Sequence, residues 1–394
     1  MNIFSDVNRL SEKYSSLTAN NLSSLVQIKS LSGKEKEVQQ ELKRQMEENG
    51  ADSVIIDGLG NVIGRLGKGP RFIAIDGHID TVDTGNLTNW NANPFSGKIT
   101  NDSVYGRGTV DQKGGIASMV TAMRIIGELG VPEELSVFFV GSVMEEDCDG
   151  LCWKFIIEED KLKPELVIIT EPTNLGIYRG QRGRMEIQVA FKGISAHGSA
   201  PERGINAIYS ASRIALEIEK LNNHLAFDKF LGKGSVTVSE FISGSPSLCA
   251  VADYARLHID RRLTWGEKEE TALNEIRQLI NKEDVFIEVP IYEGISYTGM
   301  KYDMKKYFPT WKLDEDHQVI ERGALAFRKL YDRNPLIDKW TFSTNGVVIN
   351  GIYGIPVIGF GPGNEALAHA PNENVPINDL VVSSAFYAAY IYTL

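Results

Sequence analysis

The sequence predicts an α/β protein with a largely parallel central sheet, interrupted by a second unit of α+β type. Short β-rich runs alternate with segments of helical length up to about residue 183. Alternating strands dominate residues 184–295, and the first texture returns in residues 296–394. Strands that alternate with helices are typical of layered folds with a parallel sheet. A chain of 394 residues is long enough for two such units.

The first segment, residues 1–183, begins with two expected helices, at residues 6–30 and 34–49. Gly50 is expected to end the second one. A further helix, rich in Ala, Met and Ile, is expected at residues 113–130. The expected strands are the short β-rich runs SVIID, NVIGRLG, RFIAIDGH, LSVFFVGSV and ELVIIT.

The middle segment, residues 184–295, has the pattern of an inserted domain. A long helix is expected over GINAIYSASRIALEIEKLN, and the expected strands are RMEIQVAFKG, VTVSEFIS, YARLHIDRR and DVFIEVP. Strands with helices on one face make a compact α+β unit of roughly 110 residues. The last segment then adds a helix, DHQVIERGALAFRKLY, and a buried strand, IPVIGFG.

Composition and charge narrow the range of partners. A net charge of −11 and a pI near 5.2 argue against nucleic-acid binding, which needs clustered Lys and Arg, so a small molecule or short peptide is expected instead. The N-terminus lacks a basic and apolar signal pattern, and no apolar run reaches membrane-spanning length, so no membrane association is expected. Three cysteines fit a reducing compartment, and the expected location is cytoplasmic.

Acidic side chains and histidines follow four of the expected strands, where ligands bind in open α/β sheets. Another acid lies in a glycine-rich turn just before a helix. These residues are His78, Asp80, Glu145, Glu146, Glu171, His369 and, in the turn, Asp111. Imidazole and carboxylate donors suit zinc, cobalt or manganese, and a carboxylate can bridge two such ions. The sequence therefore predicts a metal centre in one crevice.

The division of labour within this set follows from position. Glu145 and Glu146 are adjacent, so one can hold a metal while the other remains free as a general base. Asp80 lies two residues beyond His78 and is placed to accept the second ring N–H of that histidine. Each residue alone has an ordinary explanation, such as a helix cap for Asp111 or a solvated acidic turn for the glutamate pair.

Six motifs occur in one order: GHIDTVDTG, YGRGTVDQKGG, MEEDCDG, TEPTN, GISAHGSAPERGINAI and AHAPNE. In this order and spacing they resemble the M20 family of dinuclear metallohydrolases, which includes aminoacylases, carboxypeptidases, dipeptidases and deacylases. The resemblance implies a zinc-peptidase-like catalytic domain with a ferredoxin-like lid inserted at residues 184–295. It also implies two divalent metal ions per subunit, zinc in the resting protein, with cobalt or manganese as alternatives.

The resemblance also implies a role for each matching residue. His78 and Glu171 would hold one metal, Glu146 and His369 the other, and Asp111 would bridge them. Glu145 would be the general base, and Asp80 would orient His78.

In the lid, the resemblance implies a homodimer interface and two further site residues. His197 would reach the neighbouring subunit's site and donate to the oxyanion. Arg262 would grip a substrate carboxylate. The chain departs from the family pattern at Cys249 and Ala252, where many members carry Asn and Pro.

The stretches YRGQRGRMEI, HGSAPERG and FSTNGVVINGIYGIPVIGFGPG are most similar to the selenium-metabolism-linked, YgeY-like branch of the family. The expected activity is hydrolysis of an amide C–N bond in a small peptide or N-acyl amino acid. One alternative is an N-carbamoyl or ureido amino acid as substrate, and another is a non-catalytic binding protein on the same fold. Outside these roles, Arg107, Arg182 and Arg203 are interpreted as surface charges, and His224, His258 and His317 as structural histidines.

Overall fold

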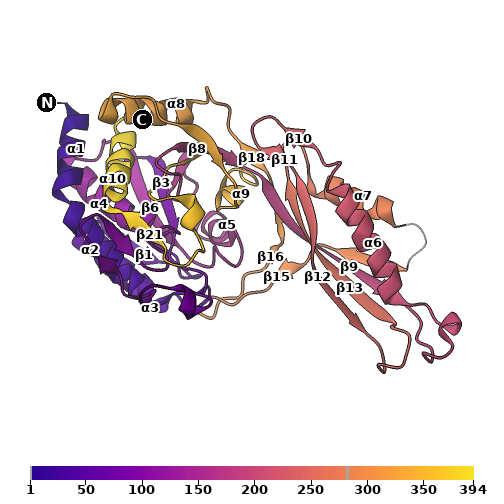
Figure 1. Ribbon diagram of the computed structural model, residues 1–394. Helices are drawn as coiled ribbons and strands as arrows, with labels where there is room; N and C mark the ends of the chain where they lie inside the picture. Colours follow the sequence, from indigo (N-terminus) through magenta and orange to yellow (C-terminus); the bar gives the residue numbers. More distant parts are fainter. Residues whose placement is uncertain (1, 281–283) are drawn as a thin grey trace.

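The larger lobe of the molecule is built on a mixed β-sheet (Figure 1). The computed structural model describes residues 2–280 and 284–394, and within them this sheet has nine strands. Its order is β1-β2-β6-β3-β7-β20-β8-β18, and β19 pairs with β8. The bounds are β1 Ser53–Ile56, β2 Val62–Leu66, β3 Arg71–His78, β6 Leu135–Ser142, β7 Leu166–Ile169, β8 Ile177–Gln181, β18 Trp311–Lys312, β19 Ile337–Trp340 and β20 Val357–Gly359.

The centre of this sheet is parallel, as predicted, whereas its flanks are mainly antiparallel, although β19 runs parallel to β8. Strands β6, β3, β7 and β20 run parallel to one another, whereas the β1–β2, β2–β6, β20–β8 and β8–β18 pairs are antiparallel. All residues of β7 and β20 are buried, which is why these strands are continuous apolar runs. The α/β fold class is therefore confirmed, with a mixed sheet whose central strands are parallel.

Helices cover both faces of the sheet. One layer comprises α1 (Ile3–Lys13), α2 (Ser15–Val26), α3 (Lys36–Glu48), α4 (Lys113–Leu129), α8 (Gln318–Tyr331) and α10 (Ile377–Ile391). The short helices α5 (Leu151–Glu158) and α9 (Gly346–Ile349) lie on the side toward the smaller lobe (Figure 1). The single helix expected at residues 6–30 is wrong, because Tyr14, at φ −95° and ψ 7°, separates α1 from α2.

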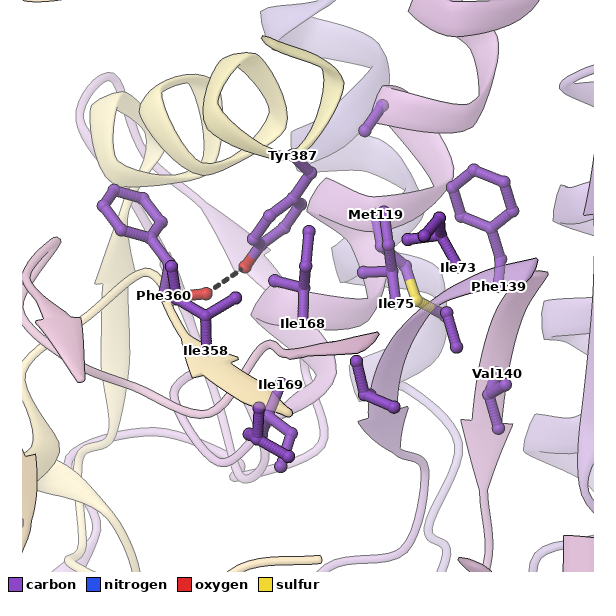
Figure 2. Close-up of a cluster of buried hydrophobic side chains, with 14 of the residues drawn as sticks. Ile73, Ile75, Met119, Phe139, Val140, Ile168, Ile169, Ile358, Phe360 and Tyr387 are labelled. Carbon is purple, nitrogen blue, oxygen red and sulfur yellow. Dashed lines mark hydrogen bonds between the residues drawn. The ribbon is translucent and has the colours of Figure 1, made fainter. Parts of the chain in front are cut away.

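The core between the sheet and α10 is close-packed. Figure 2 shows Ile75, Ile168 and Ile358, from three neighbouring parallel strands, beneath the helix. The buried hydroxyl of Tyr387 donates a 2.7 Å hydrogen bond to the carbonyl of Phe360, so its polar atom is satisfied within the core. This packing fixes the ends of the parallel strands relative to one another.

The smaller lobe has an antiparallel sheet with helices on one face (Figure 1). Its strand order is β12-β13-β9-β14, with β17 also paired to β9, and α6 and α7 cover it. The bounds are β9 Gly183–Lys192, α6 Ala207–Leu221, β12 Ser235–Gly244, β13 Tyr254–Leu263, α7 Glu269–Leu279, β14 Val285–Glu288 and β17 Tyr307–Phe308. Burial alternates along β13, so one face packs on the helices and the other is polar.

The two lobes are joined where β8 runs into β9 through Arg182. The returning chain pairs with both strands there, Phe308 with Arg184 and Trp311 with Gln181. The remaining short elements are η1 Leu87–Asn89, β4 Lys98–Ile99, β5 Ser103–Tyr105, η2 Pro201–Arg203, β10 Phe227–Asp228, β11 Gly232–Lys233, β15 Ile291–Tyr292, β16 Met304–Lys305, η3 Glu365–Leu367 and β21 Asn374–Pro376.

None of the helices in the described part of the chain has the length and apolar character needed to cross a membrane.

Candidate metal centre

The parallel strands bring the predicted acids and histidines to one edge of the sheet. Strand β3 ends at His78, Glu171 lies two residues beyond β7, and Asp111 lies two residues before α4. Helix α4 approaches this edge closely, because a Cβ on Gly115 would lie 2.5 Å from the carbonyl oxygen of Thr170. Glycine at that position therefore lets the turn that carries Asp111 reach the ends of the strands.

His78 lies at the centre of the first group of donors. Its Nε2 is 2.9 Å from Asp111 Oδ1, 3.5 Å from Glu171 Oε1 and 3.9 Å from Glu145 Oε2. Burial works against a charged ring, but hydrogen bonds with Asp111 and Asp80 outweigh it and raise the pKa of His78 well above its ordinary value.

Asp111 also reaches the second group of donors. Its Oδ2 is 3.3 Å from His369 Nε2, and the same nitrogen is 2.9 Å from Glu146 Oε2. One carboxylate thus faces a histidine with each of its oxygens, which is the geometry of a bridging ligand. Donor atoms of His78, Asp111 and Glu146, and likewise of His78, Glu145 and Glu171, lie within 4.8 Å of one another.

Three buried carboxylate oxygens in this cluster lack partners. Glu145 Oε1, Glu146 Oε1 and Glu171 Oε2 have no hydrogen-bond partner among the described residues. Burial raises the pKa of Glu146 to about 7 and the pKa values of Glu145 and Glu171 well above their ordinary range. Buried carboxylates without partners, beside two histidines, fit a pair of divalent cations as counter-charges.

Asp80 contacts both His78 and the turn that carries the two glutamates. The backbone carbonyl of Asp80 lies 2.9 Å from His78 Nδ1, whereas its carboxylate is 3.5 Å away. That carboxylate accepts from the backbone N–H groups of Glu145, at 3.3 Å, and Glu146, at 3.1 Å. It also accepts from the hydroxyl of Ser32. Asp80 therefore holds the turn of the two glutamates as well as the ring of His78.

Two further residues that the sequence interpretation missed join the loops of the site. Glu373 is fully buried, and its carboxylate accepts from the N–H groups of Gly108, Val110 and Asp111 at 2.7–3.0 Å. Its Oε2 also pairs at 2.6 Å with Arg107, which donates at 3.2 Å to the carbonyl of His369.

The interpretation of Arg107 as a surface charge is therefore wrong, since this side chain is only 2% exposed. Two sequence features could have pointed to these residues. Arg107 lies in YGRG, four residues before Asp111, and Glu373 lies in AHAPNE, four residues after His369. Other interpretations hold: the His317 side chain caps α8, and that of His258 bonds to Glu186 and Ser239.

A cavity of about 360 Å³ opens above the acids. Asp111, Glu145, Glu146, Glu171 and His369 line it. The smaller lobe contributes Arg262 and Arg184 to the same wall. The site thus combines metal donors with two cationic side chains, which suits a small anionic or polar ligand.

His197 is not brought into this cavity. It is exposed on the loop after β9, where its Nδ1 lies 2.7 Å from Ser199 Oγ and its backbone pairs with Ala250. Within one chain it therefore contacts its own loop rather than the acids.

The chain is similar to a known family of peptidases and to several of its relatives. Residues 74–393 match the model of peptidase family M20/M25/M40. The chain is 52% identical over 370 residues to YgeY of Escherichia coli K12, covering 93% of this chain and 92% of that protein. It is 25% identical over 352 residues to succinyl-diaminopimelate desuccinylase 1 of Alteromonas mediterranea, covering 86% of each.

The solved structure of aminopeptidase PepT from Bacillus cereus shares the fold. The TM-score is 0.74 at 22% identity, with 96% of this chain and 98% of that one covered. The family match spans most of the chain and includes every donor of the cluster described above. Together, the converging donors and this match show that the chain is a metal-dependent hydrolase belonging to peptidase family M20/M25/M40.

Proposed function

We propose that the protein hydrolyses an amide C–N bond in a small peptide or N-acyl amino acid. The observation that carries this proposal is the position of Glu145, a buried carboxylate with one unpartnered oxygen beside the metal donors of the cavity. His78 and Glu171 would hold one cation, Glu146 and His369 the other, with Asp111 between them. Two bound cations, zinc in the resting protein, would polarise the substrate carbonyl and acidify a water.

Glu145 would act as the general base. Its side chain is buried, and burial raises its pKa well above the ordinary value, so it holds a proton more readily than an exposed glutamate does. The carboxylate would take the proton of the attacking water and return it to the leaving nitrogen. Asp80, which binds the backbone N–H of Glu145, would keep this carboxylate in place.

We further propose that residues 184–295 form a lid and dimerisation domain between the catalytic segments 1–183 and 296–394. This lobe has its own hydrophobic core, and the exposed Phe241 and Ile242 lie on its edge strand β12. A second copy paired there would carry its His197 toward the first cavity, as an oxyanion donor. The three cysteines are unpaired, which supports a cytoplasmic location.

A ureido substrate is the second candidate. The segment with the unusual Cys249 and Ala252 packs against the His197 loop, because the N–H of Gly198 donates at 2.7 Å to the carbonyl of Cys249. A changed contact at Cys249 would shift the His197 loop and so change how His197 is presented to the substrate carbonyl. The solved structure of AtUAH in complex with (S)-hydroxyglycine shares the fold at a TM-score of 0.65.

Hydrolysis of a mixed substrate panel, followed by mass spectrometry, tests the proposal. The panel holds dipeptides and N-acetyl, N-succinyl and N-carbamoyl amino acids, with zinc, cobalt or manganese added. Cleavage of dipeptides or acyl compounds is expected, and selective cleavage of the carbamoyl compounds would support the ureido alternative. Glu145→Gln, with equal metal content, should lower kcat by about 10²-fold or more. Binding without turnover in the unmodified protein would identify a non-catalytic binding protein.

A further inference from the structure

The loop that carries His197 has a fixed backbone, although His197 and Ser199 are exposed. His197 forms an isolated antiparallel bridge with Ala250. The N–H of Gly198 donates at 2.7 Å to the carbonyl of Cys249, and a Cβ on Gly198 would lie 2.6 Å from that oxygen. Glycine at this position lets the two segments approach so closely. The ring of His197 is therefore attached to a backbone of defined position.

Ser199 contacts the ring of His197 with both its backbone and its side chain. Its backbone N–H donates to Nδ1 of the ring at 3.1 Å, and its hydroxyl oxygen lies 2.7 Å from the same nitrogen. A backbone N–H can only donate, so Nδ1 must present its lone pair and accept. The hydroxyl group can turn its proton toward either partner, and beside a nitrogen that accepts, it donates as well.

These two contacts determine which nitrogen of the ring carries the proton. A neutral imidazole has one proton, so acceptance at Nδ1 places that proton on Nε2. Nε2 has no hydrogen-bond partner among the residues that the structure describes, and its N–H is therefore available to a ligand. The other tautomer would present a lone pair at Nε2, which repels an oxyanion instead of stabilising it.

We propose that Ser199 is a positioning residue that fixes His197 in the tautomer with its proton on Nε2, as a donor to the substrate oxyanion in a second copy of the chain. Ser199 itself touches neither the substrate nor the metal donors and acts through the ring. This inference rests on the proposed function, because that function supplies the acceptor for the Nε2 proton.

Nitrogen NMR of protein with ¹⁵N-labelled histidine tests the tautomer directly, at about pH 8, where an ordinary histidine is neutral. Loss of signals in His197→Gln identifies those of His197. In the unmodified protein we expect the proton on Nε2 alone. Ser199→Ala, which keeps only the backbone donor, should show a mixture of tautomers. Ser199→Asp places an acceptor beside the ring and should draw a proton to Nδ1.

Kinetics with the best substrate of the panel should follow the same order. Ser199→Thr keeps the hydroxyl group and should retain most of the activity. Ser199→Ala should lower kcat on the order of 3–10-fold, which corresponds to the loss of one hydrogen bond. Ser199→Asp should lower kcat on the order of 10²-fold, as the loss of an oxyanion donor does. KM and metal content should change little in all three variants.

Ser239→Ala is the matched control. Ser239 is also exposed in the smaller lobe, and its Oγ also lies 2.7 Å from a histidine Nδ1, that of His258, but this pair has no role in the proposed site. Its removal should leave kcat unchanged. An equal loss of kcat in Ser239→Ala and Ser199→Ala would overturn the proposal.

The NMR measurement separates this proposal from the proposed function, because it uses no substrate. A proton on Nε2 that moves to Nδ1 in Ser199→Asp supports the role of Ser199 even if no member of the panel is hydrolysed. A proton on Nδ1 in the unmodified protein, or the same tautomer in Ser199→Asp, rejects that role even if hydrolysis is observed.

Discussion

Glu373 shows how one buried carboxylate outside the donor cluster can hold two ligand loops together. Through backbone N–H groups it binds the turn that ends at Asp111, and through Arg107 it reaches the carbonyl of His369. Gln in its place keeps the size but turns an NH₂ group toward backbone N–H donors. We expect Glu373→Gln to weaken metal binding by about 10–100-fold, as outer ligands of metal sites typically do. Competition with a chromophoric chelator measures this.

Glu267 offers a matched control for that prediction. Its buried carboxylate also binds an arginine, Arg261, and a backbone N–H, that of Thr264, but it does so in the smaller lobe. Glu267→Gln should lower Tm while metal affinity stays unchanged. If both variants lose the same metal affinity, or neither loses any, Glu373 is not a positioning residue.

For single residues, prediction from the sequence depended on whether the residue lies in a motif. His78, Asp111 and Glu146, whose donor atoms the fold brings together, could be named as candidate ligands because each lies in a motif at the end of an expected element. The contacts of Arg107 and Arg184 could not be predicted, because they depend on pairings that local sequence does not encode. Arg107 binds a residue 266 positions away, and Arg184 faces Arg262 only through the β9–β13 register.

At the scale of elements, the alternation of strands and helices correctly predicted the α/β class and the parallel strands that carry the donors. The position of β20 between β7 and β8 was not predictable, since it brings strands from distant parts of the chain together. The returning strands β17 and β18 have two residues each, too few for a periodic pattern. Long-range pairing, rather than local preference, determines these parts.

The convergence of five segments of the chain on one acidic cluster also has a consequence for stability. Glu145, Glu146 and Glu171 are buried close to one another: burial raises the pKa of all three, and the charges of Glu171 and Glu146 raise that of Glu145 further. Cations that bind only the folded chain should therefore stabilise it, by about 2.7 kcal/mol per site at a free concentration 100 times the Kd. We expect a chelator to lower the Tm of the larger lobe, measured by scanning calorimetry, and zinc to restore it.

A ligand variant provides the control for this effect. Glu171→Gln removes one charged donor, so its Tm should respond less to chelator and zinc than that of the unmodified protein. An equal response in both proteins would show that the metal acts elsewhere on the chain.

At the scale of the whole molecule, the two lobes leave one predicted residue without a role inside a single chain. The side chain of His197 is exposed and bonds Ser199 of its own loop, whereas the cavity is lined by other residues of both lobes. A site completed by a second copy accounts for this position, because a symmetric pair would exchange the two His197 side chains. The proposal then requires that activity depend on residues from two chains.

Subunit mixing tests this requirement. His197→Ala and Glu145→Gln should each be nearly inactive as homodimers, but a mixed dimer has one cavity with an intact Glu145 and an intact His197 from its partner. Random exchange at equal amounts makes half of the dimers mixed, with one working site in two, so about a quarter of the original activity should return. Both variants should keep their metals, because neither change removes a proposed ligand. Activity equal to the mean of the two separate variants would instead mean that each chain completes its own site, and His197 would then have no part in catalysis across the interface.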